Sequence, residues 1–142
     1  MKEIIWLICG FINIGIGLLH VYISFKGPEA LRYYGAGEWM ATKAEQGSSF
    51  PAIVTNAIAL AFFVFALYSF AGAEMGWVKI PLLSYALIAI AALYLLRGSV
   101  ILAFPFAYKT FSNFDRISTY IALAIGILHA AGAYLFLTEN TY

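Results

Sequence analysis

Four long apolar stretches dominate this chain and restrict it to one kind of fold. They lie at about 4–25, 51–71, 80–103 and 117–137. At 1.5 Å per helical residue, each stretch is long enough to cross a hydrocarbon core about 30 Å thick. Because backbone groups find no water there, we expect all four stretches to be α-helices. The composition agrees, since 63% of the 142 residues are hydrophobic and only 11% are charged.

The links between these stretches predict a single domain that covers residues 1–142. Two short links, 72–79 and 104–116, make consecutive helices antiparallel neighbours, whereas the link 26–50 is long enough to form structure of its own. The expected fold class is an all-α integral membrane protein, a four-transmembrane-helix antiparallel bundle with a long, partly helical interfacial first connection. The first stretch lacks a small-residue cleavage pattern, so we expect it to be retained.

The first connection contains signals for an interrupted interfacial helix. Pro28 suits the first turn of a helix, and Glu29 favours the positive end of the helix dipole. A helix from Pro28 to about Gln46 would contain Gly35 and Gly37, and each glycine weakens a helix by about 1 kcal/mol. We expect a break at these glycines, and the segment is either a lid over the bundle or a passive amphipathic link.

The distribution of lysine and arginine predicts the orientation in the membrane. The face that holds the first and third connections carries more of these residues than the opposite face, which has Lys2 and Lys79. The basic residues of the richer face are Lys26, Arg32, Lys43, Lys109 and Arg116. The positive-inside rule therefore places the long connection in the cytoplasm and both termini on the other side, in a bacterial-type inner membrane. A net charge of +1 gives no reason to expect a nucleic-acid partner.

Arg97 is the charged residue that stands inside an apolar stretch. Burying a guanidinium in hydrocarbon costs from about 3 to above 10 kcal/mol, so such a side chain is expected to face polar groups, water or a ligand. The alternative is that it extends along the helix to lipid phosphates. Counting 1.5 Å per residue places His20, Thr55, Asn56 and Arg97 about 6 to 9 Å from the long-connection end, with Tyr94 one turn from Arg97.

These residues predict a polar pocket in one leaflet. Arg97, Asn56, Thr55 and Tyr94 are the candidate binding residues. His20 is the group in that layer that exchanges a proton near neutral pH, so it is the candidate acid or base. Its alternative role is a structural hydrogen bond to Asn56 or to a backbone carbonyl. Glu38, on the first connection, is a second catalytic candidate that would complete the site from above.

Two further polar residues lie deeper in the bundle. Asn13 and His129 both fall about 18 Å from the long-connection face, where a hydrogen bond between them would satisfy both side chains. We interpret this pair as structural. The matching strings around His20 and His129 also suggest haem b with two axial histidines, but a difference of about 10 Å in depth argues against it. We predict no metal site and assign no cofactor.

Several functions fit these features. The leading hypothesis is a polytopic membrane protein that binds or processes a lipophilic or amphipathic small molecule, with membrane lipids or such a molecule as its partner. The alternative is a non-catalytic assembly or scaffold subunit of a larger membrane complex or homo-oligomer. A haem b or quinone-linked redox protein is a third option. The sequence leaves open whether the chain is an enzyme.

The outline of the chain resembles a known group of membrane enzymes. In length, in its large first connection and in the arginine of its third span, it is similar to the MAPEG superfamily, small four-helix membrane enzymes that act on lipid-like electrophiles with glutathione. The resemblance implies a MAPEG-like membrane transferase as one further option. That family carries a charged glutamate, arginine and asparagine stretch in its second helix, whereas the second span here has only Thr55 and Asn56. No residue role is transferred.

Overall fold

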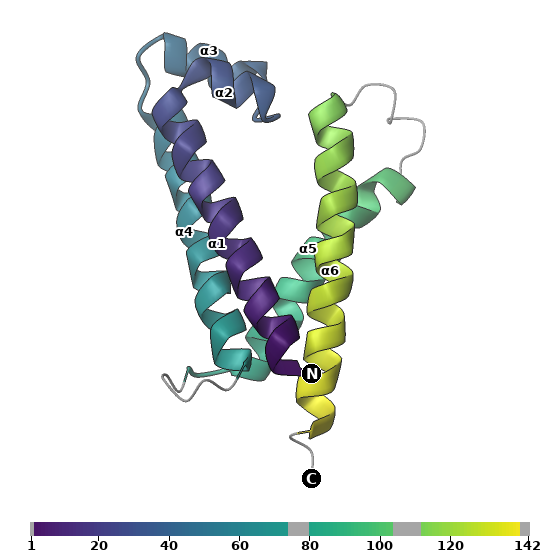
Figure 1. Ribbon diagram of the computed structural model, residues 1–142. Coiled ribbons are helices and arrows are strands. Elements are labelled where there is room, and N and C mark those ends of the chain that lie inside the picture. Colours follow the sequence, from purple (N-terminus) through teal and green to yellow (C-terminus); the bar gives the residue numbers. More distant parts are fainter. Residues whose placement is uncertain (1, 74–79, 104–111, 140–142) are drawn as a thin grey trace.

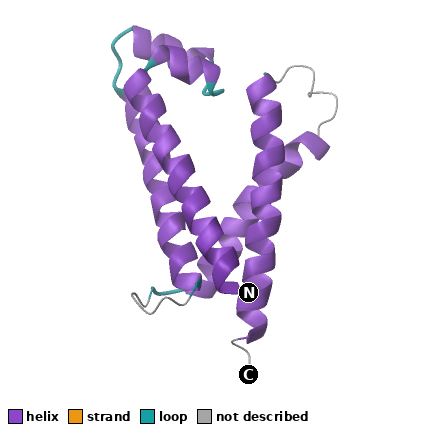
Figure 2. Ribbon diagram, viewed as in Figure 1, coloured by secondary structure: helices purple, strands orange, loops and turns teal. Residues whose placement is uncertain are grey.

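The computed structural model describes residues 2–73, 80–103 and 112–139, and that part of the chain forms helices without any strand (Figures 1 and 2). The helices are α1 (Lys2–Lys26), α2 (Pro28–Tyr33), α3 (Glu38–Glu45), α4 (Phe50–Gly72), α5 (Leu83–Ala103) and α6 (Asn113–Glu139). The predicted all-helical fold is confirmed for these residues.

Four of these helices, α1, α4, α5 and α6, are long and apolar enough to cross a membrane. They cover the four predicted stretches with small differences at the ends. Helix α5 begins at Leu83 rather than at residue 80, because Pro81 disfavours helical backbone at residue 80 and Leu82 has a φ of 56°, which is outside the helical range. Helix α6 begins at Asn113 rather than at residue 117. It starts earlier than predicted because Ser112 and Asp115 cap its first turn.

The capping pair at the start of α6 consists of Ser112 and Asp115. The backbone N–H of Asp115 donates to Oγ of Ser112 at 3.0 Å, and the backbone N–H of Ser112 donates to Oδ2 of Asp115 at 3.2 Å. These bonds satisfy amide groups that have no partner within the first turn. The cap fixes the end of α6 that lies opposite α2.

The long helices form two pairs, which meet at one end and diverge at the other (Figure 1). Helix α1 packs along α4, and α5 packs along α6. The first residues of α1 and the last of α6 lie at the end where the pairs meet, and α2 and α3 lie at the open end. An ion pair of 2.9 Å between Lys2 and Glu139 joins α1 to α6 at the closed end.

Glycines allow close packing within each pair. A Cβ atom at Gly98 would lie 2.5 Å from the Cα atom of Leu123, and one at Gly126 would lie 2.8 Å from the backbone nitrogen of Leu95. The backbones of α5 and α6 therefore touch, as small residues permit between membrane helices. In the other pair, a Cβ atom at Gly17 would lie 2.8 Å from the ring of Phe63.

The closed end contains the main hydrophobic core. Trp6 is fully buried there among side chains from both pairs. The buried residues of this core besides Trp6 are Cys9, Ala73, Leu87, Ala133 and Phe136. The core holds the pairs together at this end and leaves them separate near α2 and α3 (Figure 1).

The first connection folds back over the open end as α2 and α3. The chain turns between them at Gly35, with φ of 77°, and at Gly37, with φ of 92°, values that glycine adopts without steric cost. The predicted break falls at these two residues. A buried cluster of Ile23, Leu31 and Ala41 packs α2 and α3 against α1.

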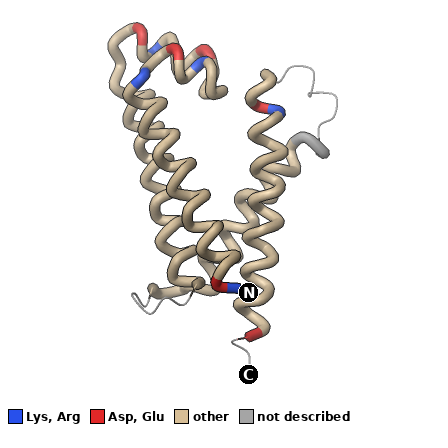
Figure 3. Tube along the Cα trace, in the orientation of Figure 1, with Lys and Arg blue, Asp and Glu red and all other residues tan. Residues whose placement is uncertain are grey.

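An ion cluster also connects the two short helices. Arg32 donates from Nε to both carboxylate oxygens of Glu38, at 3.0 and 2.9 Å, and from Nη1 to Glu45 at 2.7 Å. Hydrogen bonds from Arg32 lower the pKa of Glu38 and of Glu45, and the same bonds raise the pKa of Arg32. Apart from Arg97, the charged residues of the described chain gather at this connection and at the helix ends (Figure 3).

Candidate functional site

A cleft of about 570 Å³ lies between the two helix pairs. It extends down from α2 between α1 and α4 on one side and α5 and α6 on the other. The residues that line it are Gly15, Ile16, Leu19, His20, Ile23, Tyr34, Ile58, Phe62, Phe65, Leu93, Tyr94, Arg97, Phe114, Ile117, Ser118, Ile121, Ala122 and Ile125.

The walls of the cleft are mainly aliphatic and aromatic side chains. Ile58, Leu93, Ile117 and Ile121 line it and are also well exposed on the protein. The cleft therefore opens onto the surface of the helix bundle. Among the described residues, Arg97 is the charged side chain in its lining.

Arg97 reaches from α5 to the start of α6. Its Nη1 donates to Oγ1 of Thr119 at 2.7 Å, and its Nη2 donates to Oγ of Ser118 at 3.3 Å. Both hydroxyls in turn donate to the backbone carbonyl of Asp115, at 3.1 Å from Ser118 and 2.7 Å from Thr119. Two neutral hydroxyls thus orient the guanidinium along the α6 wall.

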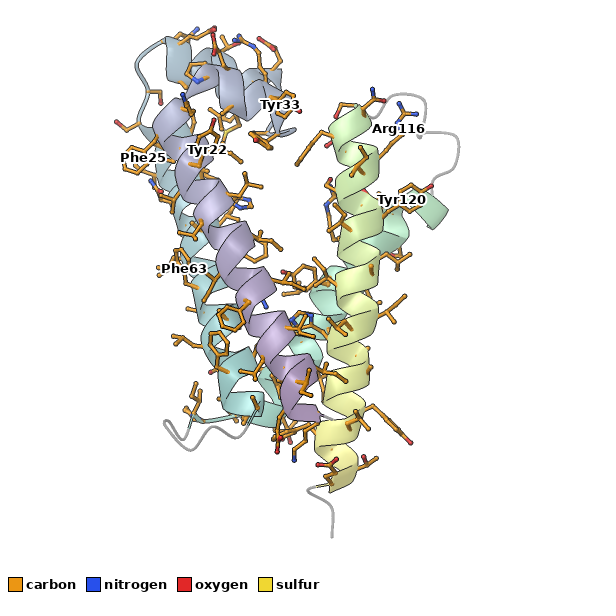
Figure 4. The ribbon with its side chains drawn as sticks, viewed as in Figure 1. Tyr22, Phe25, Tyr33, Phe63, Arg116 and Tyr120 are labelled. Atoms are coloured by element: carbon orange, nitrogen blue, oxygen red, sulfur yellow. The ribbon has the colours of Figure 1, made fainter. Side chains whose placement is uncertain are left out.

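Aromatic side chains from the end of α2 and from α6 meet across the mouth of the cleft. The rings of Tyr34 and Phe114 are 5.2 Å apart at an angle of 88°, and the ring of Tyr33 is 6.3 Å from Phe114. A Cβ atom at Gly35 would lie 2.5 Å from Oδ1 of Asp115. Tyr33 stands at the end of α2 that faces α6, whereas Phe25 and Tyr120 point away from the cleft (Figure 4). The end of α2 therefore covers part of the mouth.

His20 lies on the α1 wall of the cleft, half-buried. Its Nδ1 is 2.8 Å from the carbonyl oxygen of Ile16. Since a carbonyl only accepts hydrogen bonds, Nδ1 carries the proton and Nε2 carries the lone pair in the neutral ring. The ring lies 5.2 Å from that of Phe62.

A polar cluster closes the cleft at its lower end. Tyr94 lines the cleft and donates from its hydroxyl to Oδ1 of Asn13 at 2.7 Å. The amide nitrogen of Asn13 lies 3.1 Å from Nε2 of His129, 2.9 Å from the carbonyl of Cys9 and 3.4 Å from Oγ of Ser69. We call Asn13, Ser69, Tyr94 and His129 the Asn13 cluster. It joins α1, α4, α5 and α6.

The structure brings together some of the residues predicted for the site and separates others. Arg97, His20 and Tyr94 all line the cleft, and the amide nitrogen of Asn13 lies within hydrogen-bond distance of His129. Thr55 and Asn56 do not line it. Thr55 is buried and donates to the carbonyl of Pro51 at 2.7 Å, and Asn56 donates to Ser24 at 2.9 Å.

Glu38 also lies outside the cleft lining, because its carboxylate is bound by Arg32 on the exposed side of α2 and α3. Equal depth in a helix bundle does not imply a shared face, which is why Thr55 and Asn56 are separated from Arg97. The roles proposed for these residues stay predictions.

Sequence reasoning missed Ser118 and Thr119, the two partners of Arg97. Their signal is a pair of hydroxyl residues two and three positions after the charged pair Asp115-Arg116, at the start of the fourth predicted stretch. An arginine side chain is long enough to reach them although their depths differ.

The histidines do not form a metal site in the described part of the chain. Nδ1 of His129 donates to the carbonyl of Ile125 at 2.9 Å, so its Nε2 accepts from Asn13. Both ring nitrogens of this buried residue therefore have protein partners, and no lone pair is directed toward a haem iron. No group of three or more His, Cys, Asp or Glu side chains within residues 2–73, 80–103 and 112–139 is arranged to hold a metal ion.

Comparison of the chain with protein-family models, with curated proteins and with solved structures finds no match. The similarity in outline to the MAPEG superfamily therefore gains no support from a family match. The proposed function therefore rests on the geometry of the cleft.

Proposed function

We propose that this chain is an integral membrane protein whose cleft binds a lipophilic or amphipathic small molecule from one leaflet. The observation that carries the proposal is the combination of apolar walls, an opening onto the bundle surface and a single arginine in a cleft of about 570 Å³. Binding sites for small molecules have this volume and this mixture of many apolar groups with few polar ones. The apolar part of the ligand lies along the walls, and its polar end lies near Arg97.

In this proposal the four long helices cross the membrane as antiparallel neighbours. The excess of lysine and arginine around α2 and α3 and the start of α6 supports a cytoplasmic position for the open end. The ligand then lies in the cytoplasmic leaflet, and the membrane is of the bacterial inner type. Large apolar side chains such as Phe25, 88% exposed, contact the acyl chains on the outside.

Binding is the activity that the geometry supports best. If a reaction follows binding, its proton acceptor is Nε2 of His20, because the other ring nitrogen donates to Ile16. We expect the substitution His20→Gln to leave ligand binding in place, since a hydrogen bond to the carbonyl of Ile16 and a contact with Phe62, rather than a charge, hold the ring in the wall.

Mass spectrometry of the protein purified in mild detergent tests the proposal. Gly15 lines the cleft, and a Cβ atom there meets no atom within 4 Å, so Gly15→Phe fills the cleft from the α1 wall without a backbone clash. Leu18 is 56% exposed and lies outside the cleft lining, which makes Leu18→Phe the matched control.

The proposal predicts a defined small molecule on the wild-type protein and on Leu18→Phe, and its loss from Gly15→Phe. A molecule retained equally by all three proteins, or none on the wild type, contradicts it. If the wild-type protein carries no small molecule and purifies with a stoichiometric protein partner, the result supports the scaffold alternative.

A further inference from the structure

We propose that the ligand of the cleft is a single-chain amphiphile whose headgroup presents negatively charged oxygen atoms to Arg97. This inference rests on the proposed function, because it concerns the chemistry of the molecule that the cleft binds. The headgroup is a carboxylate or a phosphate, two groups that share the same charged oxygen chemistry.

The first reason is that the charge of Arg97 is not compensated within the described chain. Arg97 has hydrogen bonds to two hydroxyls and no ion pair with a described residue. No carboxylate of residues 2–73, 80–103 or 112–139 lines the cleft. A cation at this depth costs several kcal/mol unless an anion or water accompanies it, so the site favours a ligand that supplies the negative charge.

Three carboxylates of the neighbouring elements are engaged elsewhere. Glu38 and Glu45 bind Arg32, and Oδ2 of Asp115 accepts from Ser112. None of these groups reaches Arg97 as a counter-ion. The anion therefore has to come from outside the described chain.

The second reason is the supply of hydrogen-bond donors. A guanidinium has five N–H groups in a planar fork that matches the oxygens of a carboxylate or phosphate. Ser118 and Thr119 take one N–H each. Their own protons go to the carbonyl of Asp115, so these hydroxyls act on Arg97 only as acceptors. They fix the orientation of the fork and leave the remaining N–H groups for a ligand.

The third reason is the length of the cleft. Its α6 wall runs from Phe114 to Ile125, which is about 16 Å at 1.5 Å per residue. Half of a hydrocarbon core about 30 Å thick is the length of one acyl layer. The cleft therefore accommodates one chain of one leaflet, with its end near Ile125.

The distribution of polar side chains along the cleft supports a ligand that lies with its headgroup at the mouth and its chain toward the closed end. Ser118, the hydroxyl partner of Arg97, lies near the mouth, and Ile125 is about 10 Å further along α6. The headgroup then lies at the mouth, below Tyr34 and Phe114, and the chain extends toward the closed end. A cationic headgroup would be repelled by Arg97, and a neutral one would leave its charge uncompensated.

Titration of the delipidated protein with three probes of equal chain length tests the inference. The probes are hexadecanoate, hexadecyl phosphate and hexadecanol, and native mass spectrometry in dodecyl maltoside measures their dissociation constants. Hydrogen bonds to a charged group contribute enough binding free energy to predict that the anionic probes bind about tenfold more tightly than the alcohol. The anion that binds more tightly identifies the chemical source of the headgroup, a free fatty acid or a single-chain phosphate ester.

Variants of Arg97 assign the preference to this side chain. Arg97→Gln is expected to bring both anions to the affinity of hexadecanol, whereas Arg97→Lys keeps the positive charge and retains a preference. Arg116→Gln is the control, because Arg116 lies on the same end of α6 but outside the cleft lining. If Arg97→Gln does not fold, the comparison of the three probes on the wild type and on Arg97→Lys still decides the question.

The outcomes separate the two proposals. Equal binding of acid, phosphate and alcohol by the wild type overturns the anionic headgroup and leaves the proposed function standing. Failure of all three probes to bind overturns both. A preference for the anions that persists in Arg97→Gln overturns the role of Arg97.

Discussion

Replacing Asn13 by alanine removes the centre of the Asn13 cluster and leaves several buried groups without partners. The side chain is fully buried, and it contacts Tyr94, His129 and Ser69 on three other helices. Hydrogen bonds between membrane helices average about 0.6 kcal/mol, so three of them predict a loss of about 2 kcal/mol in the free energy of unfolding.

The matched control is Asn56→Ala. Asn56 is exposed and has a single interhelical bond, to Ser24, so we expect a loss of about 0.6 kcal/mol. The free energy of unfolding is measured for both variants by titrating protein in mild detergent with sodium dodecyl sulfate and following helix content by circular dichroism. Losses that agree within about 0.5 kcal/mol for the two variants would refute the central position of Asn13.

Two further predictions concern packing and pH. Gly126→Ala places a Cβ atom 2.8 Å from the backbone of α5, whereas the Cβ atom of Gly15→Ala enters open space. In the same detergent titration, Gly126→Ala is expected to lower the free energy of unfolding by about 1 to 3 kcal/mol, and Gly15→Ala to stay close to wild type. Equal losses for the two variants would contradict the backbone contact. Because Arg32 holds the pKa values of Glu38 and Glu45 below 4.5, the contribution of this ion cluster is complete above that pH and is lost as the pH falls through the lowered values. Spin labels on α2 and α3 are therefore expected to keep one distance between about pH 5 and 8 and to show a broader distribution in acid. A distance that is insensitive to acid would count against the cluster as the connection between α2 and α3.

The sequence predicts most of the helical architecture, because apolar length alone decides it. It also predicts the contact between Asn13 and His129, since both are polar residues at one depth and a buried polar side chain needs a partner. The break in the first connection follows from Gly35 and Gly37, whose positive φ values other residues rarely adopt.

The composition of the cleft was less predictable. Counting along the helices predicts one depth for Thr55, Asn56 and Arg97, but Thr55 and Asn56 do not line the cleft. Their positions depend on the pairing of α1 with α4 and on the divergence of the two pairs, which involve contacts between residues far apart in the sequence. Ser118 and Thr119 depend on the direction in which Arg97 extends, and spacing along the helix does not determine it.

Photochemical labelling tests most directly whether the cleft is the ligand site. A hexadecanoate with a diazirine at the end of its chain is bound to the protein in phosphatidylcholine nanodiscs, irradiated, and located by peptide mass spectrometry. The account predicts adducts on residues of the inner walls near the closed end, such as Phe65 and Ile125, and their loss in Gly15→Phe. Adducts spread over outward-facing residues such as Phe25 and Tyr120, unchanged in Gly15→Phe, would contradict it.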